Sequence, residues 1–460
     1  MVSSECPKWL TAWRLAMSLP TLSSVEKLQQ ALHTKAKEEP GFRFYALYDK
    51  VYRKDVLWQA YQRCRHNDGA PGVDGQTFED IEHYGVQRWL GELAEELRSK
   101  RYVPQPVQRA YIAKPDGKQR PLGIPTIRDR VVQTAVQLVL EPIFEADLQP
   151  EQHAYRRGHS SQDALKEVDK LLYQGHEEVV DADLSGYFDS IPHAELMQSV
   201  ARRVSDKRVL HLVKMWLVAP VEETDERGQK RRTTRNKDEG RGSPQGAPLS
   251  PLLANLYMRR FVLGWKTLGH ERNLKAKIVN YADDFVICCR RGYGAKALET
   301  MQQMMDRLKL TVNEDKTHLC RLPGESFNFL GYTFGRIWSP RKGRLYTGYR
   351  PSQKSLKRLR DEIHQETGRN WLWQSEEEMI GKLNRFLVGW RNYFSVGTVQ
   401  ETYRSVDAYL FQRLRQWWCR KHKVRNRRDS RFSARFLYQQ LGLVELRARR
   451  HVPCAKVCEA

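Results

Sequence analysis

Two aspartates stand side by side in Tyr281-Ala-Asp-Asp284, between the apolar segments 277–280 and 285–289. A plain hairpin turn is commonly Asn-Gly or Asp-Gly, and adjacent like charges repel each other unless a cation neutralises them. An isolated Asp-Asp pair is weak evidence, since most such pairs are simply exposed acids. The apolar segments on both sides, which are typical of strands, favour a metal-binding hairpin.

A third carboxylate, Asp183, ends the apolar segment Val179-Val-Asp-Ala-Asp-Leu184. If the two strands are neighbours, Asp183 meets the hairpin acids, and the three side chains could hold two divalent cations roughly 3.5–4 Å apart. Magnesium is the expected metal because it prefers carboxylate, phosphate and water oxygens. Strand alternation places Asp181 on the same face, so Asp181 could also be a ligand, whereas Asp189 lies beyond the strand and is predicted to be structural.

A basic hairpin is predicted at Lys114-Pro-Asp-Gly-Lys-Gln-Arg120. Lys114, Lys118 and Arg120 at its tip suit a triphosphate, because an arginine forks onto phosphate oxygens. Taken alone, the segment could equally be a solvated basic turn.

The elements that must position these residues change character along the chain. Strands are predicted at 107–112, 177–184 and 278–289 and a helix at 129–144, which indicates an α+β sheet domain. After about Pro351 the pattern is purely helical. Two capping boxes, Ser375-Glu-Glu-Glu378 and Thr398-Val-Gln-Glu401, open helices with apolar stripes, and with an earlier helix they predict a three-helix bundle.

Charge and cysteine usage narrow the class of protein. The 460 residues include 78 Lys and Arg against 55 Asp and Glu, a net charge of +23 that favours a nucleic-acid partner over mere solubility. The basic residues concentrate late in the chain, where 413–456 holds 14 Lys and Arg against only Asp429 and Glu445. The eight cysteines include no C-x-x-C pair, so structural zinc and a disulfide framework are not expected. We expect a cytoplasmic protein, since no secretory signal or membrane span is evident.

The motifs, taken in order, resemble those of group II intron reverse transcriptases. After the basic hairpin come the Asp-x-x-x-x-Phe motif at Asp183, Ser243-Pro-Gln-Gly-Ala-Pro-Leu-Ser-Pro251, the Tyr-Ala-Asp-Asp hairpin, Asn313-Glu-Asp-Lys316 and Phe329-Leu-Gly331. Several independent motifs in the correct order, over about residues 25 to 425, make chance agreement very improbable. The resemblance implies a right-hand polymerase with fingers, palm and a helical thumb or maturase domain.

The resemblance also implies roles for single residues. The ligands of two Mg²⁺ ions would be Asp183, Asp283 and Asp284. The residues that contact the dNTP would be Lys114, Arg120, Gln245 and Phe188, and the Phe188 ring would exclude a ribose 2′-hydroxyl. Lys316 would be a candidate proton donor to pyrophosphate, and Leu330 and Gly331 would form the primer grip. Phe188, Leu330 and Gly331 could each be ordinary packing or turn residues if they stood outside this series.

The segment Ala154-Tyr-Arg-Arg-Gly-His-Ser-Ser-Gln-Asp-Ala-Leu165 resembles the family's template-binding motif only in part. Arg156, Gly158 and Ser160 match, so a template or RNA contact is expected there. Arg391, which lies between aromatic residues, is a candidate RNA contact in the thumb. The expected domains are an N-terminal extension at 1–60, fingers and palm at 61–340, the thumb or maturase domain at 345–420, and a basic tail at 421–460 that could bind DNA.

The implied function is an RNA-directed DNA polymerase of a mobile group II intron that also binds intron RNA to assist splicing. Its partners would be template and intron RNA, a DNA primer and target, and dNTPs, with no membrane. The resemblance is to the bacterial type of these proteins, but without their HNH endonuclease domain, which is rich in Cys and His. That domain is not expected, since Cys454 and Cys458 lack further ligands. The alternatives are a non-enzymatic splicing maturase, a host-adapted reverse transcriptase linked to CRISPR or defence, and an RNA-dependent RNA polymerase, against which Phe188 argues.

Overall fold

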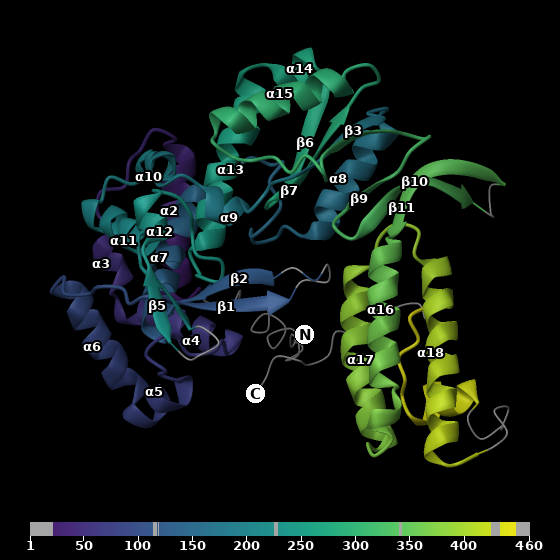
Figure 1. Ribbon diagram of the computed structural model, residues 1–460. Helices are drawn as coiled ribbons and strands as arrows, with labels where there is room; N and C mark the ends of the chain where they lie inside the picture. Colours follow the sequence, from purple (N-terminus) through teal and green to yellow (C-terminus); the bar gives the residue numbers. More distant parts are fainter. Residues whose placement is uncertain are drawn as a thin grey trace, which may run out of the picture. The chain divides into compact units, whose positions relative to one another are not determined.

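The computed structural model describes residues 22–113, 117, 119–224, 229–339, 343–424 and 433–447. The chain, drawn in Figure 1, divides into two units, and each unit is built from three separate segments of the sequence. Unit 1 comprises Met1–Arg157, Leu184–Trp265 and Gln303–Thr311, and unit 2 comprises Gly158–Asp183, Lys266–Gln302 and Val312–Ala460. Lys114 and Lys118 lie outside the described residues, as do 1–21 of the predicted N-terminal extension.

Unit 1 combines helices with one small sheet. Its helices are α2 (Ser24–Glu38), α3 (Tyr48–Val51), α4 (Lys54–Asn67), α5 (Phe78–Tyr84), α6 (Val86–Arg98), α7 (Ile127–Glu145), α9 (Tyr187–Ser190), α10 (His193–Ala201), α11 (Lys207–Leu217), α12 (Arg235–Asp238) and α13 (Ser250–Thr267). Its sheet has the order β2-β1-β4-β5, with β1 at Val107–Ala113, β2 at Gln119–Ile124, β4 at Val221–Thr224 and β5 at Lys230–Thr233.

Helix α7 forms the core of unit 1. Its sequence is apolar at most positions, and the helices α2 and α4 pack against it. Thr126 caps its first turn by accepting a hydrogen bond from the Asp129 backbone N–H. Where α2 meets α7, the buried Gln29 amide donates to the Leu138 carbonyl at 2.8 Å, so this polar group is satisfied inside the core. The strand predicted at 107–112 and the helix predicted at 129–144 are thus confirmed as β1 and α7.

Unit 2 contains two sheets. The first has the order β6-β7-β3-β8 and consists of β6 (Ala276–Tyr281), β7 (Asp284–Cys289), β3 (Glu178–Asp183) and β8 (His318–Arg321). The second has the order β11-β10-β9 and consists of β9 (Phe327–Phe329), β10 (Tyr332–Ser339) and β11 (Arg344–Pro351). The accompanying helices are α8 (Ser161–Tyr173), α14 (His270–Asn273) and α15 (Gly294–Arg307), whose last residues belong to unit 1.

One core joins α8 to both sheets. Leu165 and Val168 of α8 pack with Val179 and Val286 of the first sheet, while Phe334 of the second sheet belongs to the same cluster. Burial on both faces explains why β7 is apolar from Phe285 to Cys289 instead of alternating. Strand β3 is mixed, since Val179, Val180 and Ala182 are buried but Glu178, Asp181 and Asp183 are acidic. The acidic residues of these strands therefore stand out as exceptions to their surroundings.

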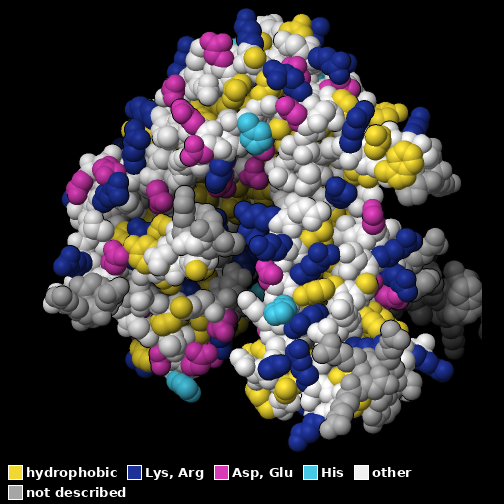
Figure 2. Space-filling view, turned by 45° about the vertical axis from the view of Figure 1, so that its right-hand side comes forward, with side chains coloured by type: hydrophobic (Ala, Val, Ile, Leu, Met, Phe, Trp, Pro, Cys, Tyr) yellow, Lys and Arg dark blue, Asp and Glu magenta, His cyan; other side chains and the backbone are white. Residues whose placement is uncertain are grey.

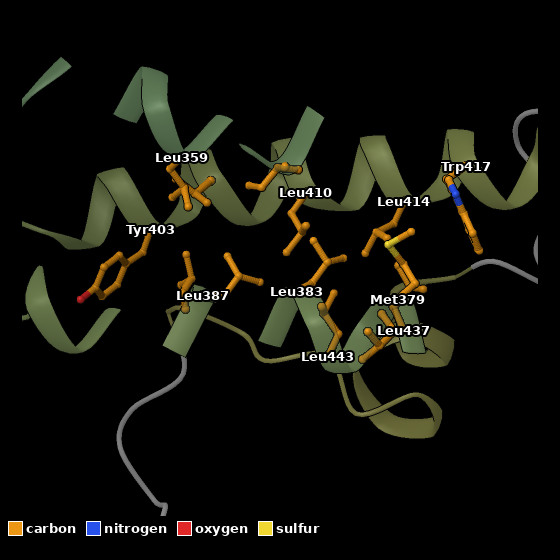
Figure 3. Packing of buried hydrophobic residues seen from close by; sticks show 14 of the residues in the cluster. Leu359, Met379, Leu383, Leu387, Tyr403, Leu410, Leu414, Trp417, Leu437 and Leu443 are labelled. Carbon is orange, nitrogen blue, oxygen red and sulfur yellow. The ribbon is translucent and has the colours of Figure 1, made fainter. Parts of the chain in front are cut away.

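The C-terminal part of unit 2 is the predicted three-helix bundle, formed by α16 (Gln353–Glu366), α17 (Glu376–Tyr393) and α18 (Gln400–Lys421), with a short 3-10 helix, η1 (Arg369–Trp371), between the first two. Figure 3 shows Leu383 and Leu387 of α17 facing Leu410 and Leu414 of α18 across its core, with Leu359 of α16 closing it. The Ser375 capping box is confirmed, since its side chain accepts from the Glu378 N–H and the Glu378 carboxylate accepts from the Ser375 N–H.

The prediction that Thr398 caps α18 is wrong. The helix begins at Gln400, its N-cap is Val399, and no side chain caps it. Instead the Thr398 N–H donates to the Tyr349 carbonyl at 2.8 Å, and the Thr398 hydroxyl lies 2.7 Å from the Tyr346 hydroxyl. The N–H and hydroxyl groups of Thr398, which the capping box requires, therefore interact with strand β11.

The described part of the basic tail extends the bundle. Residues 433–447 include a short π-helical turn, η3 (Phe436–Gln440), and Leu437, Leu443 and Leu446 are buried in the bundle core. The Asp407 carboxylate accepts from the Leu446 and Arg447 N–H groups at 3.1 and 3.2 Å, which fixes the returning segment. Among the described residues, no helix is both long enough and apolar enough to cross a membrane.

We predict that Leu410→Ala loosens the bundle without disturbing unit 1. Leu410 is fully buried, and truncation of such a side chain costs about 2–5 kcal/mol, through lost transfer energy and the cavity left behind. In hydrogen exchange by mass spectrometry, peptides from α16–α18 should exchange faster while α7 stays protected. Leu268→Ala, at a leucine that is 57% exposed, is the control. Equal protection of the bundle in wild type and Leu410→Ala would contradict the packing described here.

Candidate active site

The hairpin β6–β7 carries the adjacent acids at its turn. Tyr281 of β6 pairs with Asp284 of β7, so Ala282 and Asp283 alone form the connection. Ala282 has φ +59°, a left-handed conformation that residues with a Cβ adopt at a cost of about 1–2 kcal/mol. The buried Asn280 supports it, since the Asn280 amide donates to the Ala282 carbonyl at 2.8 Å. Strained backbone of this kind is concentrated at functional sites.

Asp183 lies opposite this turn. Strand β3 runs antiparallel to β7, and the register makes Asp183 the Cα partner of Asp284. The prediction that the strand-end acid meets the hairpin acids is therefore confirmed for their backbone positions. The Asp183 carboxylate is held by the Lys316 ammonium, 2.9 Å from Oδ2, and by the Asn313 amide at 3.3 Å.

The electrostatics of the site reflect crowded negative charge. Burial raises the pKa of Asp284 to about 8, and the carboxylates of Asp181, Asp283 and Asp183 add to the effect. Burial also raises the pKa of Asp181 to about 6, with the nearby His318 acting in the opposite direction. Each ionised carboxylate here disfavours ionisation of the next, so a bound cation would relieve the repulsion.

The donor set consists of carboxylate oxygens, which suits a hard divalent cation such as Mg²⁺. Within the part of the chain that the structure describes, no group of three or more His, Cys, Asp or Glu side chains is arranged so that it could hold a metal ion as it stands. Mg²⁺ in phosphoryl-transfer sites is usually bound by one or two carboxylates together with substrate phosphates and water. The side chains that could contribute to such a site are Asp183, Asp283 and Asp284, with Asp181 beside them.

Leu330 and Gly331 connect this site to the bundle. The Leu330 N–H lies near the Asp284 carboxyl group and opposes the rise of its pKa, and the Leu330 carbonyl accepts from the Tyr393 hydroxyl at 3.1 Å. The Gly331 carbonyl accepts from the Ser352 N–H at 2.9 Å and from the Ser355 hydroxyl at 3.0 Å, at the start of α16. Both residues have positive φ, +48° and +76°, so this tight turn is a real structural feature beside Asp284.

Unit 1 brings together the other predicted nucleotide-binding segments. Phe188 on α9 is 9% exposed, and its carbonyl accepts from the Ser243 N–H at 2.8 Å. Two residues later, the Gln245 carbonyl accepts from the Gly123 N–H of β2 at 2.6 Å. Arg120 lies exposed on the same strand, paired with Ile112. The loop 243–247 therefore joins α9 to the β1–β2 hairpin.

A close approach explains the glycine after Gln245. Gly246 has φ +108°, and a Cβ there would come within 2.7 Å of the Gly123 carbonyl oxygen. Any other residue would push the loop away from β2. The motif Ser-Pro-Gln-Gly thus has a packing reason for its last position.

The structure places the Arg156 side chain in internal contacts, and its expected template contact stays a prediction. Its side chain is 7% exposed and forms an ion pair with Glu145 at 2.6 Å, and it also donates to the Gln149 and Gln152 carbonyls at 2.8 and 2.7 Å. This geometry leaves little of the guanidinium for a ligand.

The other predicted RNA-contact residues also have structural roles. Ser160 caps α8 in a reciprocal box with Asp163, and Gly158 has φ +74°. In the bundle, Arg391 donates to the Glu445 carbonyl at 3.3 Å.

Sequence reasoning missed several residues around the acids. Asn313, Thr317, His318 and Tyr393 contact or face the aspartates. Asn313 belongs to the motif that supplied Lys316, so its place in that motif was the available signal. Tyr393 comes from the bundle, and nothing in its local sequence connects it with Asp284.

Comparison with known proteins identifies two families along the chain. A reverse transcriptase family, described as RNA-dependent DNA polymerase, matches residues 112–334. The group II intron maturase-specific domain matches residues 356–436. The first match includes Asp181, Asp183, Asp283, Asp284 and Lys316, and the second covers most of the three-helix bundle, with Tyr393 in it.

Individual relatives agree with this assignment. Protein YkfC of Escherichia coli is 32% identical over 352 residues, which are 67% of this chain and 87% of that protein. Group II intron-encoded protein LtrA of Lactococcus lactis is 33% identical over 253 residues, which are 54% of this chain but only 39% of LtrA. A putative COX1/OXI3 intron 1 protein of Saccharomyces cerevisiae is 27% identical over 286 residues, 31% of its length. The chain therefore belongs to the group II intron-encoded reverse transcriptases and maturases, a family of RNA-directed DNA polymerases.

Proposed function

We propose that this chain copies RNA into DNA for a mobile group II intron and also binds the intron RNA to assist splicing. The observation that carries the polymerase is the cross-strand pairing of Asp183 with Asp284 beside the turn that is strained at Ala282. In this proposal the sheet β6-β7-β3-β8 is the palm, α4–α7 with the β1–β2 hairpin form the fingers, and α16–α18 form the thumb.

The reaction joins the primer 3′-oxygen to the α-phosphorus of a dNTP and breaks the bond to pyrophosphate. Asp183, Asp283 and Asp284 would hold two Mg²⁺ ions, which lower the charge on the phosphates and favour ionisation of the primer hydroxyl. Arg120 and Lys114 would bind the triphosphate. Lys316, whose ammonium lies near Asp183, would donate a proton to the leaving pyrophosphate.

Other residues would position the nucleic acid. Phe188 would lie beneath the sugar of the incoming nucleotide, and Gln245 would lie beside the nucleotide and the template. Leu330 and Gly331 would hold the primer end, a role supported by the position of the Leu330 N–H next to the Asp284 carboxyl group.

The surface of the bundle supports RNA binding. Exposed basic residues on its three helices include Lys354, Lys357, Arg358, Arg385 and Arg404. Figure 2 shows Lys and Arg side chains, in dark blue, over the bundle at the lower right, with few acidic side chains among them. Such a face suits the phosphate backbone of RNA.

We predict that Asp283→Asn/Asp284→Asn abolishes primer extension on an RNA template with dNTPs and Mg²⁺. Metal-assisted phosphoryl transfer supplies several kcal/mol of transition-state stabilisation, so the rate should fall roughly 1,000-fold or more. The matched control is Asp361→Asn/Glu362→Gln, an adjacent and exposed acidic pair on α16, which should extend like wild type. Equal extension by wild type and the Asp283/Asp284 variant would refute the catalytic assignment.

We predict that Phe188→Val relaxes sugar selection. Removing the ring opens space for a ribose 2′-hydroxyl, and changes of this size in an apolar pocket are worth about 10–200-fold in discrimination. The ratio of kcat/KM for dCTP over CTP should fall by that order, while Phe188→Tyr, which keeps the ring, should preserve the ratio. If the valine variant discriminates as well as wild type, Phe188 is a packing residue.

We predict that the chain accelerates splicing of its own intron RNA at low Mg²⁺, and that the Asp283/Asp284 variant does so equally well. The reason is that the basic face of the bundle would contribute to binding the intron RNA, whereas the carboxylates would not. The measurement is the splicing rate of the precursor RNA with and without protein. If the wild type accelerates splicing but does not extend a primer, a non-enzymatic maturase is favoured. If it extends a primer but does not accelerate splicing, and no ribozyme lies in the flanking DNA, a host-adapted enzyme is favoured.

A further inference from the structure

A pocket of about 480 Å³ opens on unit 1 between α10 and α13. Its lining consists of Gln198, Ser199, Ala201, Arg202, Leu256, Arg259 and Arg260. Three of these seven residues are arginines, and the helices that carry them contain none of the predicted polymerase residues.

The arginines are held in place by single hydrogen bonds. Arg259 donates through Nε to the Asp147 carbonyl at 2.7 Å, and Arg260 donates through one Nη to the Glu195 carbonyl at 3.1 Å. Arg202 donates through one Nη to the Asp147 carboxylate. Within the described residues, the two Nη groups of Arg259 have no hydrogen-bond acceptor in the protein. The guanidinium groups are therefore oriented, and most of their donors remain available.

Positive charge at the pocket exceeds the negative charge that could neutralise it. Asp147 is shared by Arg202 and by the fully buried Arg203, whose Nε lies 3.3 Å from its carboxylate. The neighbouring Glu195 carboxylate is occupied by Lys309 at 2.5 Å. Burial, followed by repulsion from Arg202, lowers the pKa of Arg259. A bound anion would relieve this repulsion.

The chemistry of the lining favours phosphate. Planar guanidinium groups match phosphate oxygens two at a time, and the apolar Ala201 and Leu256 limit competing hydration at the pocket wall. The chain carries +23 net charge, so its main anionic partner is nucleic acid. We propose that this pocket binds a backbone phosphate of RNA through Arg259 and Arg260, as a contact additional to the polymerase site; the proposal rests on the proposed function only in taking RNA as the partner.

The test compares Arg259→Gln/Arg260→Gln with Arg88→Gln/Arg98→Gln, which removes two exposed arginines from α6 of the same unit. The assay is equilibrium binding of a fluorescein-labelled RNA hairpin over a series of KCl concentrations. Each lost phosphate contact lowers the slope of log K against log salt by roughly one. The pocket variant should lose roughly 10-fold in affinity and one to two in slope, and the α6 variant should match wild type.

Further arms separate the possible explanations. Arg259→Lys/Arg260→Lys keeps both charges and should restore most of the slope; if it binds as weakly as the glutamine variant, the effect is structural and the proposal fails. Inorganic phosphate at matched ionic strength should compete with RNA for wild type. If phosphate stabilises wild type thermally but RNA binding is unchanged in the glutamine variant, the ligand is a free phosphate and the RNA assignment is overturned.

Primer extension is read separately on a short hybrid at saturating protein. If the salt slope differs between the pocket variant and wild type but the wild type extends no primer, the pocket proposal is supported and the polymerase proposal is contradicted. An unchanged slope in an active polymerase would overturn the pocket alone. The two proposals can therefore fail independently.

Discussion

Mutual repulsion among carboxylates governs unit 2. Asp183 and Asp284 occupy facing positions on neighbouring strands, Asp283 adjoins them at the turn, and Asp181 lies two residues away on the same face. Burial and these neighbours raise the pKa of Asp284 to about 8. Because this repulsion destabilises the sheet, other interactions must hold its strands together. Strands β3 and β7 are held by apolar side chains that pack against α8 and the second sheet. The positive groups nearby, Lys316 and the Leu330 N–H, offset only part of the repulsion. The negative charge that is not offset would attract a divalent cation.

The same carboxylates are mechanically linked to the bundle. The Leu330 N–H lies near the Asp284 carboxyl group, and the Leu330 carbonyl accepts from Tyr393 of α17. Gly331 accepts hydrogen bonds from Ser352 and Ser355 at the start of α16. A turn held in the left-handed region at both residues has little freedom to absorb movement. A shift of α16 or α17 would therefore be transmitted through these hydrogen bonds to Leu330 and Gly331, next to Asp284. The start of α16 and the end of α17 are thereby coupled to the turn beside Asp284.

What the sequence could predict depended on how local each determinant was. The strands, the Ser375 cap and the three helical stripes follow from neighbouring residues, and all three are found. Thr398 has the same capping pattern as Ser375, yet Tyr346 and Tyr349 take its polar groups, because β11 comes back beside it from about fifty residues earlier. Arg156 likewise follows its motif but is consumed by Glu145 and two carbonyls. The meeting of Asp183 with Asp284 was a conditional prediction, since adjacency of β3 and β7 is a matter of strand order that no local pattern encodes.

The two charged clusters of the chain follow one physical rule. At the hairpin, aspartates are gathered with too few cations to neutralise them; at the pocket between α10 and α13, arginines are gathered around the single carboxylate of Asp147. Each arrangement is less favourable for the isolated protein than a neutral one, because like charges that approach in partly desolvated surroundings raise the free energy. Each becomes favourable only with a ligand of opposite sign. A chain with +23 net charge that must still bind cations would need its acids packed closely, since scattered acids would simply pair with the surrounding Lys and Arg. Burial of Asp284 at the start of β7, next to β3, keeps its carboxylate away from those side chains, and that separation allows a carboxylate site to exist within a strongly basic protein.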